Sequence, residues 1–267
     1  MLLSQHVAPT AVRLNQTHPD LVWQKVVRDV RFRKALNMAI NREEIIDAVY
    51  FGFASLPQSV PSVYDPAKAN QLLDEMGLNR RDAESYRLGP DGKTFVIPFE
   101  IAKHAADIVP VTELVVEHWK KVGIKATIKT IDPGLQDTRR MANELKADIM
   151  WHHGPELWWG ALWDYGSVSW GRLWDLWRVT GGKEGEEPPE VAKRFVDLVE
   201  QSIVVSPEKR QEIVKEYRRL LYENIFIMMI VEKAKYSLIV SERLGNVPHR
   251  GFAITTNFAA EQLFFRR

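Results

Sequence analysis

The feature that most limits the fold of this chain is an apolar strand, an amphipathic helix and a second strand in direct succession. The residues FVIPFEI (95–101) have the composition of a buried strand, and VPVTELVVEHWKKVG (109–123) has apolar residues at helical spacing before a terminal glycine. The next residues, IKATIKTI (124–131), alternate between apolar and polar types, as a strand does. A helix that joins two strands makes them parallel, with a right-handed crossover. The sequence therefore predicts a β-α-β unit.

Capping residues predict further helices on the N-terminal side of this unit. Asp29 opens the run DVRFRKALNMAI, and Asn41 with Glu44 forms a capping box for a second helix. Asp65, followed by Pro66, begins a third helix. The remaining predicted elements are helices over 135–147, 189–203 and from Ser206, and strands over 11–18, 147–152, 225–231 and 235–240. Together these elements predict an α/β fold in which a mixed sheet is flanked by helices.

The overall composition excludes several classes of function. The 36 Lys and Arg residues balance 35 Asp and Glu residues, so no net field attracts nucleic acid, and nucleic acid is not expected as a partner. The absence of Cys excludes thiol catalysis and thiolate metal sites. No P-loop or GxGxxG motif is present, and no cofactor is expected. The opening MLLSQHVAPT lacks a basic region, so a signal peptide is not expected in this chain.

Tryptophan is concentrated in one part of the chain, where seven of the nine residues fall between 151 and 177. Trp158, Trp159 and Trp163 follow a Gly-Pro break directly after a predicted strand. Loops at strand ends are where α/β proteins usually bind ligands, and indole rings stack on sugar rings or apolar side chains. Ligand contact and core packing both remain open for Trp158 and Trp159.

Two other patterns predict ordinary structural roles. Trp170, Trp174 and Trp177 have the spacing of one helix face, which is typical of core packing. A basic run near the N-terminus is interpreted as the solvated face of a helix. This run comprises Arg28, Arg31, Arg33 and Lys34.

The segment HHGPELWWGALWD also raises the questions of a metal site and of a hydrolase. Adjacent histidines on a strand point to opposite faces, so His152 and His153 are not expected to ligate one ion, and no metal site is predicted. Glu156 and Asp164 beside tryptophans are the residue types that a glycosidase uses to cleave sugars. A carbohydrate-active hydrolase that uses this carboxylate pair is therefore kept as an alternative.

Several passages of the sequence resemble a known family. The passage LNQTHP followed by DVRFRKALNMAINREEIIDAVYFG, and the later YDPAKANQLLDEMGL and VVEHWKKVGIKATI, resemble the second half of extracellular solute-binding proteins of the oligopeptide- and dipeptide-binding family. Those proteins deliver ligands to ABC importers. The resemblance extends over nearly the whole chain. It implies a periplasmic-binding-protein-like lobe and a binding protein without catalytic activity.

The resemblance also implies how the chain would relate to a complete member of that family. Residues 1–267 would form a single C-terminal lobe, and residues 245–267 would return to a first lobe encoded, with a signal peptide, upstream of Met1. The intact parent would act in the periplasm or on the extracellular face, with an ABC permease as partner, and its two lobes would close over the ligand. Exposed former interface would favour self-association of an isolated lobe. A lobe that acts only in such assembly is a third hypothesis.

The resemblance places the ligand in a cleft lined by the segment after the strand 147–152. The ligand-binding residues predicted in and beside this segment are Trp151, His153, Glu156, Trp158, Trp159, Trp163 and Asp164. Lys103 and His104 are secondary candidates in the loop 102–107, for which a solvated loop is the alternative. The Asp-Tyr-Pro-Asp motif typical of peptide binders has only Asp164-Tyr165 as an echo, so peptide and oligosaccharide ligands both remain open.

Overall fold

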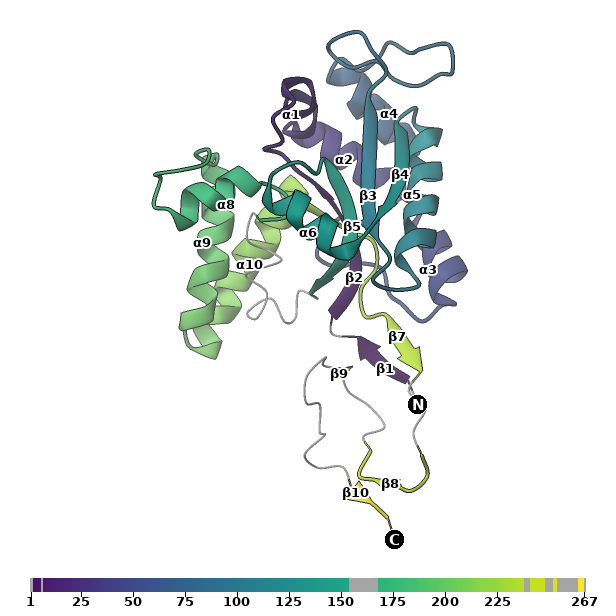
Figure 1. Ribbon diagram of the computed structural model, residues 1–267, viewed down its shortest axis with the longest axis vertical. Helices are drawn as coiled ribbons and strands as arrows, with labels where there is room; N and C mark the ends of the chain where they lie inside the picture. The colour runs from purple at the N-terminus through teal and green to yellow at the C-terminus, as the bar shows by residue number, and fades with distance from the viewer. Residues whose placement is uncertain are drawn as a thin grey trace.

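A five-stranded mixed sheet lies at the centre of the computed structural model, which describes residues 2–5, 7–153, 168–237, 241–247, 252–253 and 264–266 (Figure 1). The strand order is β4-β3-β5-β2-β6. These strands are β2 (Val7–Leu14), β3 (Val96–Ala102), β4 (Lys125–Ile131), β5 (Ala147–His153) and β6 (Ile227–Met229). β3 runs parallel to both β4 and β5, whereas β2 is antiparallel to β5 and β6. The predicted mixed sheet is confirmed.

The predicted β-α-β unit forms from β3, α5 (Ile108–Lys121) and β4. β3 and β4 pair in parallel along their whole length, from Val96 opposite Lys125 onward. Trp119 of α5 is fully buried and stacks on Phe99 of β3, with ring centroids 5.5 Å apart. Glu100 points to the opposite face, where Arg139 of α6 (Pro133–Met141) binds its carboxylate at 2.9 Å. Helices therefore cover both faces of the sheet.

Four helices precede the β-α-β unit, and they are α1 (Leu21–Val27), α2 (Val30–Met38), α3 (Arg42–Tyr50) and α4 (Pro66–Glu75). The last three begin at the predicted capping residues Asp29, Asn41 and Asp65, whereas α1, capped by Asp20, is not among the predicted elements. Asp29 accepts a hydrogen bond from the Arg31 N–H, and Asn41 accepts one from the Glu44 N–H. Such side chains satisfy backbone donors that have no partner inside the helix. Local capping chemistry thus determines where these helices begin.

Three helices, α8 (Arg172–Val179), α9 (Glu190–Val204) and α10 (Pro207–Asn224), form a group on one side of the sheet, coloured green in Figure 1. Trp170 lies between this group and the sheet, and its ring stacks on Phe226 at 4.5 Å. Trp170 and Trp174 are buried, as the helical spacing predicted, although Trp170 precedes α8. Trp177 is half-buried, with the Lys193 ammonium 5.2 Å from its ring centroid.

Short strands lie beyond one end of the central sheet, at the bottom of Figure 1. β1 (Leu2–Gln5) pairs with β7 (Lys235–Ser237) and β9 (Phe252–Ala253), and β8 (Leu244–Gly245) pairs with β10 (Phe264–Phe265). Within the described part of the chain, no helix has the length and apolar character needed to cross a membrane.

The structure corrects two predicted boundaries. The strand predicted over 11–18 is β2, which ends at Leu14, and shortly beyond it the Gln16 N–H donates to the carbonyl of Trp170 instead of to a neighbouring strand. The helix predicted over 135–147 ends at Met141. The first correction arises from a contact between distant parts of the chain, which periodicity does not encode, whereas α6 ends locally, where Asn143 has a left-handed φ of 61° and the Glu144 N–H donates to the Arg139 carbonyl.

The interpretation of the basic run as a solvated face is wrong for Arg33. This side chain is only 4% exposed. It donates to the carbonyl of Asn224 at 2.9 Å and to those of Val27 and Arg28 at 2.7 and 2.9 Å. These carbonyls lie at the ends of α10 and α1, where the helix dipole favours a cation. Arg33 therefore joins the C-terminal ends of two helices to α2.

Candidate functional site

The candidate site lies at the edge of the sheet where the parallel strands β3 and β5 end. Open α/β sheets bind ligands at the carboxyl ends of their parallel strands. β2 begins at the same edge because it is antiparallel to β5, with Val7 opposite His153 and Thr10 opposite Trp151. The predicted ligand residue Trp151 and the loop after β3 therefore reach this edge together.

A hydrogen-bonded cluster joins four elements at this edge. The carboxylate of Asp107, directly before α5, accepts hydrogen bonds from the Thr10 hydroxyl at 3.1 Å and the Tyr50 hydroxyl at 2.9 Å. Its other oxygen accepts the indole N–H of Trp151 at 3.3 Å. The Thr10 and Tyr50 oxygens are themselves 2.7 Å apart. The cluster fixes β5 relative to β2, α3 and α5.

The electrostatics of this cluster keep Tyr50 as a neutral donor. Burial raises the pKa of the Tyr50 hydroxyl far above its ordinary value, and the Asp107 charge raises that pKa further. Asp107 occupies the N-cap position of α5, yet its side chain makes no capping hydrogen bond to the helix. Its carboxylate is used instead to orient Trp151. Since the indole N–H is occupied by Asp107, the partly exposed ring is the part of Trp151 that remains for contact with a ligand.

The other predicted site residues fall into two groups. Lys103 and His104 are exposed, and the His104 ring nitrogen Nε2 is 3.4 Å from the side-chain oxygen of Gln136. Both therefore lie in a largely solvated loop near the candidate edge. The backbone of His153 ends β5. The side chain of His153, and the residues Glu156, Trp158, Trp159, Trp163 and Asp164, lie outside the described part of the chain.

Sequence reasoning missed Asp107, Tyr50 and Thr10. Asp107 carried one usable signal, an acidic residue directly before a predicted helix, which normally indicates an N-cap. No sequence pattern shows that its carboxylate turns toward Trp151 and Tyr50 instead. Both partners are distant along the chain, so only the folded structure brings the three side chains together.

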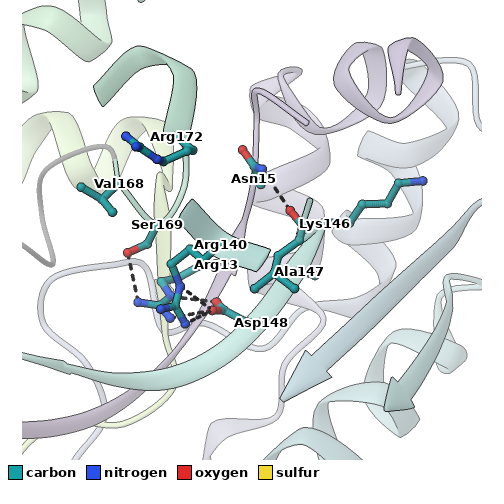
Figure 2. Close-up of a pocket in the computed structure, with 10 residues that line it drawn as sticks. Arg13, Asn15, Arg140, Lys146, Ala147, Asp148, Val168, Ser169 and Arg172 are labelled. Carbon is teal, nitrogen blue, oxygen red and sulfur yellow. Dashed lines mark hydrogen bonds and ion pairs between the residues drawn. The ribbon is translucent and has the colours of Figure 1, made fainter. Parts of the chain in front are cut away.

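A buried ionic cluster lies further along the same two strands (Figure 2). Arg13 of β2 binds both oxygens of Asp148 of β5 at 2.8 and 2.7 Å, and Arg140 of α6 binds the same carboxylate at 3.0 Å. Burial alone would raise the pKa of Asp148, but the two guanidinium charges outweigh it and hold that pKa below its ordinary value. The adjoining void, of about 10 Å³, is too small for a solute. This cluster fixes the strands that carry the candidate site.

A metal centre finds no support in the described residues. Nowhere among them do three or more His, Asp or Glu side chains gather in a group able to hold a metal ion. The carboxylate of Asp107 is not part of such a group either, because its hydrogen-bond partners are hydroxyl groups and an indole N–H.

Comparison with known proteins places these features in a family. A family model described as "Bacterial extracellular solute-binding proteins, family 5 Middle" matches residues 4–167, which include β2 to β5. The chain is 28% identical over 232 residues to di/tripeptide-binding protein 1 of Pseudomonas aeruginosa, and the match covers 80% of this chain and 39% of that protein. It is 22% identical over 263 residues to the periplasmic alpha-galactoside-binding protein of Rhizobium meliloti, covering 90% and 37%.

The similarity extends to solved structures. The chain superimposes on the oligopeptide-binding protein OppA with a TM-score of 0.75 and 27% identity, over 100% of this chain and 48% of that one. The periplasmic-binding-protein-like fold predicted from the sequence is therefore confirmed. The chain spans about two fifths of the length of the two curated relatives it matches, at 39% and 37%.

Proposed function

The chain belongs to family 5 of the bacterial extracellular solute-binding proteins, and from this premise we propose that it supplies one lobe of a solute-binding protein for an ABC importer. Members of the family are non-enzymatic proteins of the periplasm or cell exterior. We place the chain there as the C-terminal lobe, with residues 245–267 leading to a first lobe and with an ABC permease as the eventual partner. This assignment is supported by the extent of the matches, in which the chain covers 39% of the di/tripeptide-binding protein and 48% of OppA, about the share expected of one lobe.

The observation that carries the proposal is the Asp107 cluster at the sheet edge. It holds Trp151, a partly exposed aromatic residue, at the carboxyl ends of the strands, where α/β proteins bind ligands. The segment that follows β5 contains Trp158, Trp159 and Trp163, which we propose extend the same surface together with His153, Glu156 and Asp164. Lys103 and His104 would line its other side.

We propose an oligopeptide or an oligosaccharide as the solute. Relatives of both kinds exist, since one is named for di- and tripeptides and another for alpha-galactosides. An indole ring whose N–H is already occupied offers its face, which stacks on sugar rings and on apolar side chains alike. Self-association of the lobe through exposed apolar surface is a second proposal, supported by Phe51 and Phe53, which are 79% and 45% exposed.

Titration of the chain with raffinose and with trialanine, followed by calorimetry, tests the proposed function. We expect saturable binding of one of the two, and about tenfold weaker binding by the Trp151→Ala variant because a stacking contact is lost. Trp177→Ala, which removes a half-buried tryptophan on α8, serves as the matched control and should bind as the parent chain does.

Two outcomes would count against this function. The absence of saturable binding by either probe would refute solute binding by this chain, and equal weakening by both tryptophan variants would refute the site at the sheet edge. The relatives do not favour the alternative of a hydrolase using Glu156 and Asp164. Release of monosaccharides from raffinose, lost in Glu156→Gln, would establish that alternative in place of binding.

A further inference from the structure

A cavity of about 450 Å³ lies at the opposite end of β2 from the candidate solute site. Gln16, just after β2, and Arg33 of α2 form part of its wall, and Trp174 of α8 and Phe226 beside β6 form another part. The volume falls within the range of about 300–1,000 Å³ that is typical of small-molecule pockets. Because Val7, at the start of β2, lies opposite His153, whereas Gln16 follows the end of β2 at Leu14, this cavity is separate from the sheet edge that carries Trp151.

Two buried side chains on the cavity wall have donors without a partner. Gln16 is 2% exposed, and its amide nitrogen Nε2 has no hydrogen-bond partner in the part of the chain that the structure describes. Arg33 is 4% exposed, and its three hydrogen bonds to carbonyls use only Nε and Nη1. A buried donor without an acceptor is costly, so Gln16 Nε2 indicates a missing acceptor, and Arg33 adds a cation to the same cavity wall.

The acidic residues of the cavity already have cationic or indole partners. Glu186 binds Arg28 at 2.8 Å and accepts the indole N–H of Trp174 at 3.3 Å. Glu187 binds Lys193 at 2.5 Å. Among the described residues Arg33 forms no ion pair, and although burial lowers its pKa to about 10, the side chain remains cationic at neutral pH.

The rest of the cavity wall is apolar. Phe226 is 3% exposed and lies under the guanidinium of Arg33, 5.9 Å from ring centroid to Cζ. Val191 and Pro189, at the start of α9, line the same space. The cavity therefore combines a cation and an amide donor with an apolar surface large enough for a ring or a short alkyl chain.

We propose that this cavity is a second, separate binding site for a small hydrophobic carboxylate. The carboxylate accepts hydrogen bonds from Nη2 of Arg33 and Nε2 of Gln16, and the apolar body packs against Phe226 and Val191. A carboxylate interacts with a guanidinium group through both charge and hydrogen bonds, whereas a neutral ligand of the same shape lacks the charge interaction. The site does not depend on the solute proposed for the sheet edge.

Calorimetric titration of the chain with benzoate tests this site, with benzyl alcohol as the neutral probe of similar shape. We expect one saturable site for benzoate and binding at least about tenfold weaker for benzyl alcohol. Gln16→Leu should weaken benzoate binding by about tenfold and should fold, because it replaces an amide without a hydrogen-bond partner. Val191→Trp should abolish binding by filling the cavity, whereas Val179→Trp, at a position 59% exposed, should leave it unchanged.

The inference is overturned by any of three results. The first is the absence of saturable benzoate binding up to about 10 mM, and the second is an affinity for benzyl alcohol equal to that for benzoate. The third is an unchanged benzoate affinity in Gln16→Leu. Circular dichroism verifies that each variant is folded, and the Gln16 variant decides the question if Val191→Trp does not fold. Because raffinose and trialanine probe a different surface, failure here leaves the result for the sheet edge intact.

Discussion

The Asp148→Asn variant is expected to lose about 3–5 kcal/mol of unfolding free energy, the usual result of removing one partner of a buried ion pair. Asp148 is 4% exposed and is the shared partner of Arg13 and Arg140, which are 2% and 6% exposed. Without the carboxylate, two buried guanidinium groups lose their common counter-charge. Urea denaturation at pH 7, compared with the parent chain, measures the difference.

Asp137→Asn is the matched control for this variant. Asp137 also forms an ion pair with Arg140, but its side chain is 62% exposed, so water replaces most of what the pair contributes. We expect a loss below about 1 kcal/mol for this control. Equal losses in the two variants would show that burial of the Asp148 cluster does not determine its contribution to stability.

The difference in unfolding free energy between the parent chain and Asp148→Asn should depend on pH. The folded-state pKa of Asp148 is lowered, so the stability that the carboxylate contributes is fully present above its unfolded pKa of about 3.9. That contribution decreases as the pH falls through the folded-state pKa, because the protonated side chain no longer balances the two guanidinium charges. The difference in stability between the parent chain and Asp148→Asn should therefore narrow below about pH 4.

The parts of the fold that follow local rules could be predicted from the sequence. The β-α-β unit could be predicted because the first strand has the composition of a buried strand, the helix has apolar residues at helical spacing, and the second strand alternates between apolar and polar residues. The caps Asp29 and Asn41 lie next to the N–H groups they satisfy, so their role is independent of the rest of the fold. The family resemblance rested on these same segments.

The parts that depend on distant contacts could not be predicted. Arg33 occupies a basic run that is typical of a solvated helix face, yet it is buried because the ends of α1 and α10 supply carbonyl acceptors. Asp107 has the sequence position of a cap, yet it binds Tyr50 and Trp151. For the candidate site, the sequence predicts ligand contact at the sheet edge that carries Trp151. It did not indicate the polar side chains that hold this residue there.

Trp170→Ala is expected to destabilise the protein by about 3–5 kcal/mol, the usual cost of removing a buried tryptophan side chain. Trp170 is fully buried, with its ring stacked on Phe226 and in edge contact with Trp174 and Phe195, at centroid distances of 5.8 and 5.9 Å. These partners lie on α8, on α9 and at the start of β6, so one ring joins the helix group to the sheet. Urea denaturation followed by circular dichroism measures the loss.

A control variant and the shape of the unfolding transition show whether Trp170 joins the helix group to the sheet. Trp177→Ala removes the same kind of side chain from a half-buried position on α8 and should cost less than half as much. If Trp170 joins the helix group to the sheet, the parent chain should unfold in one transition, and Trp170→Ala should separate it into two. Equal losses for the two tryptophans, or one unchanged transition in Trp170→Ala, would show that α8 to α10 are held to the sheet by other contacts.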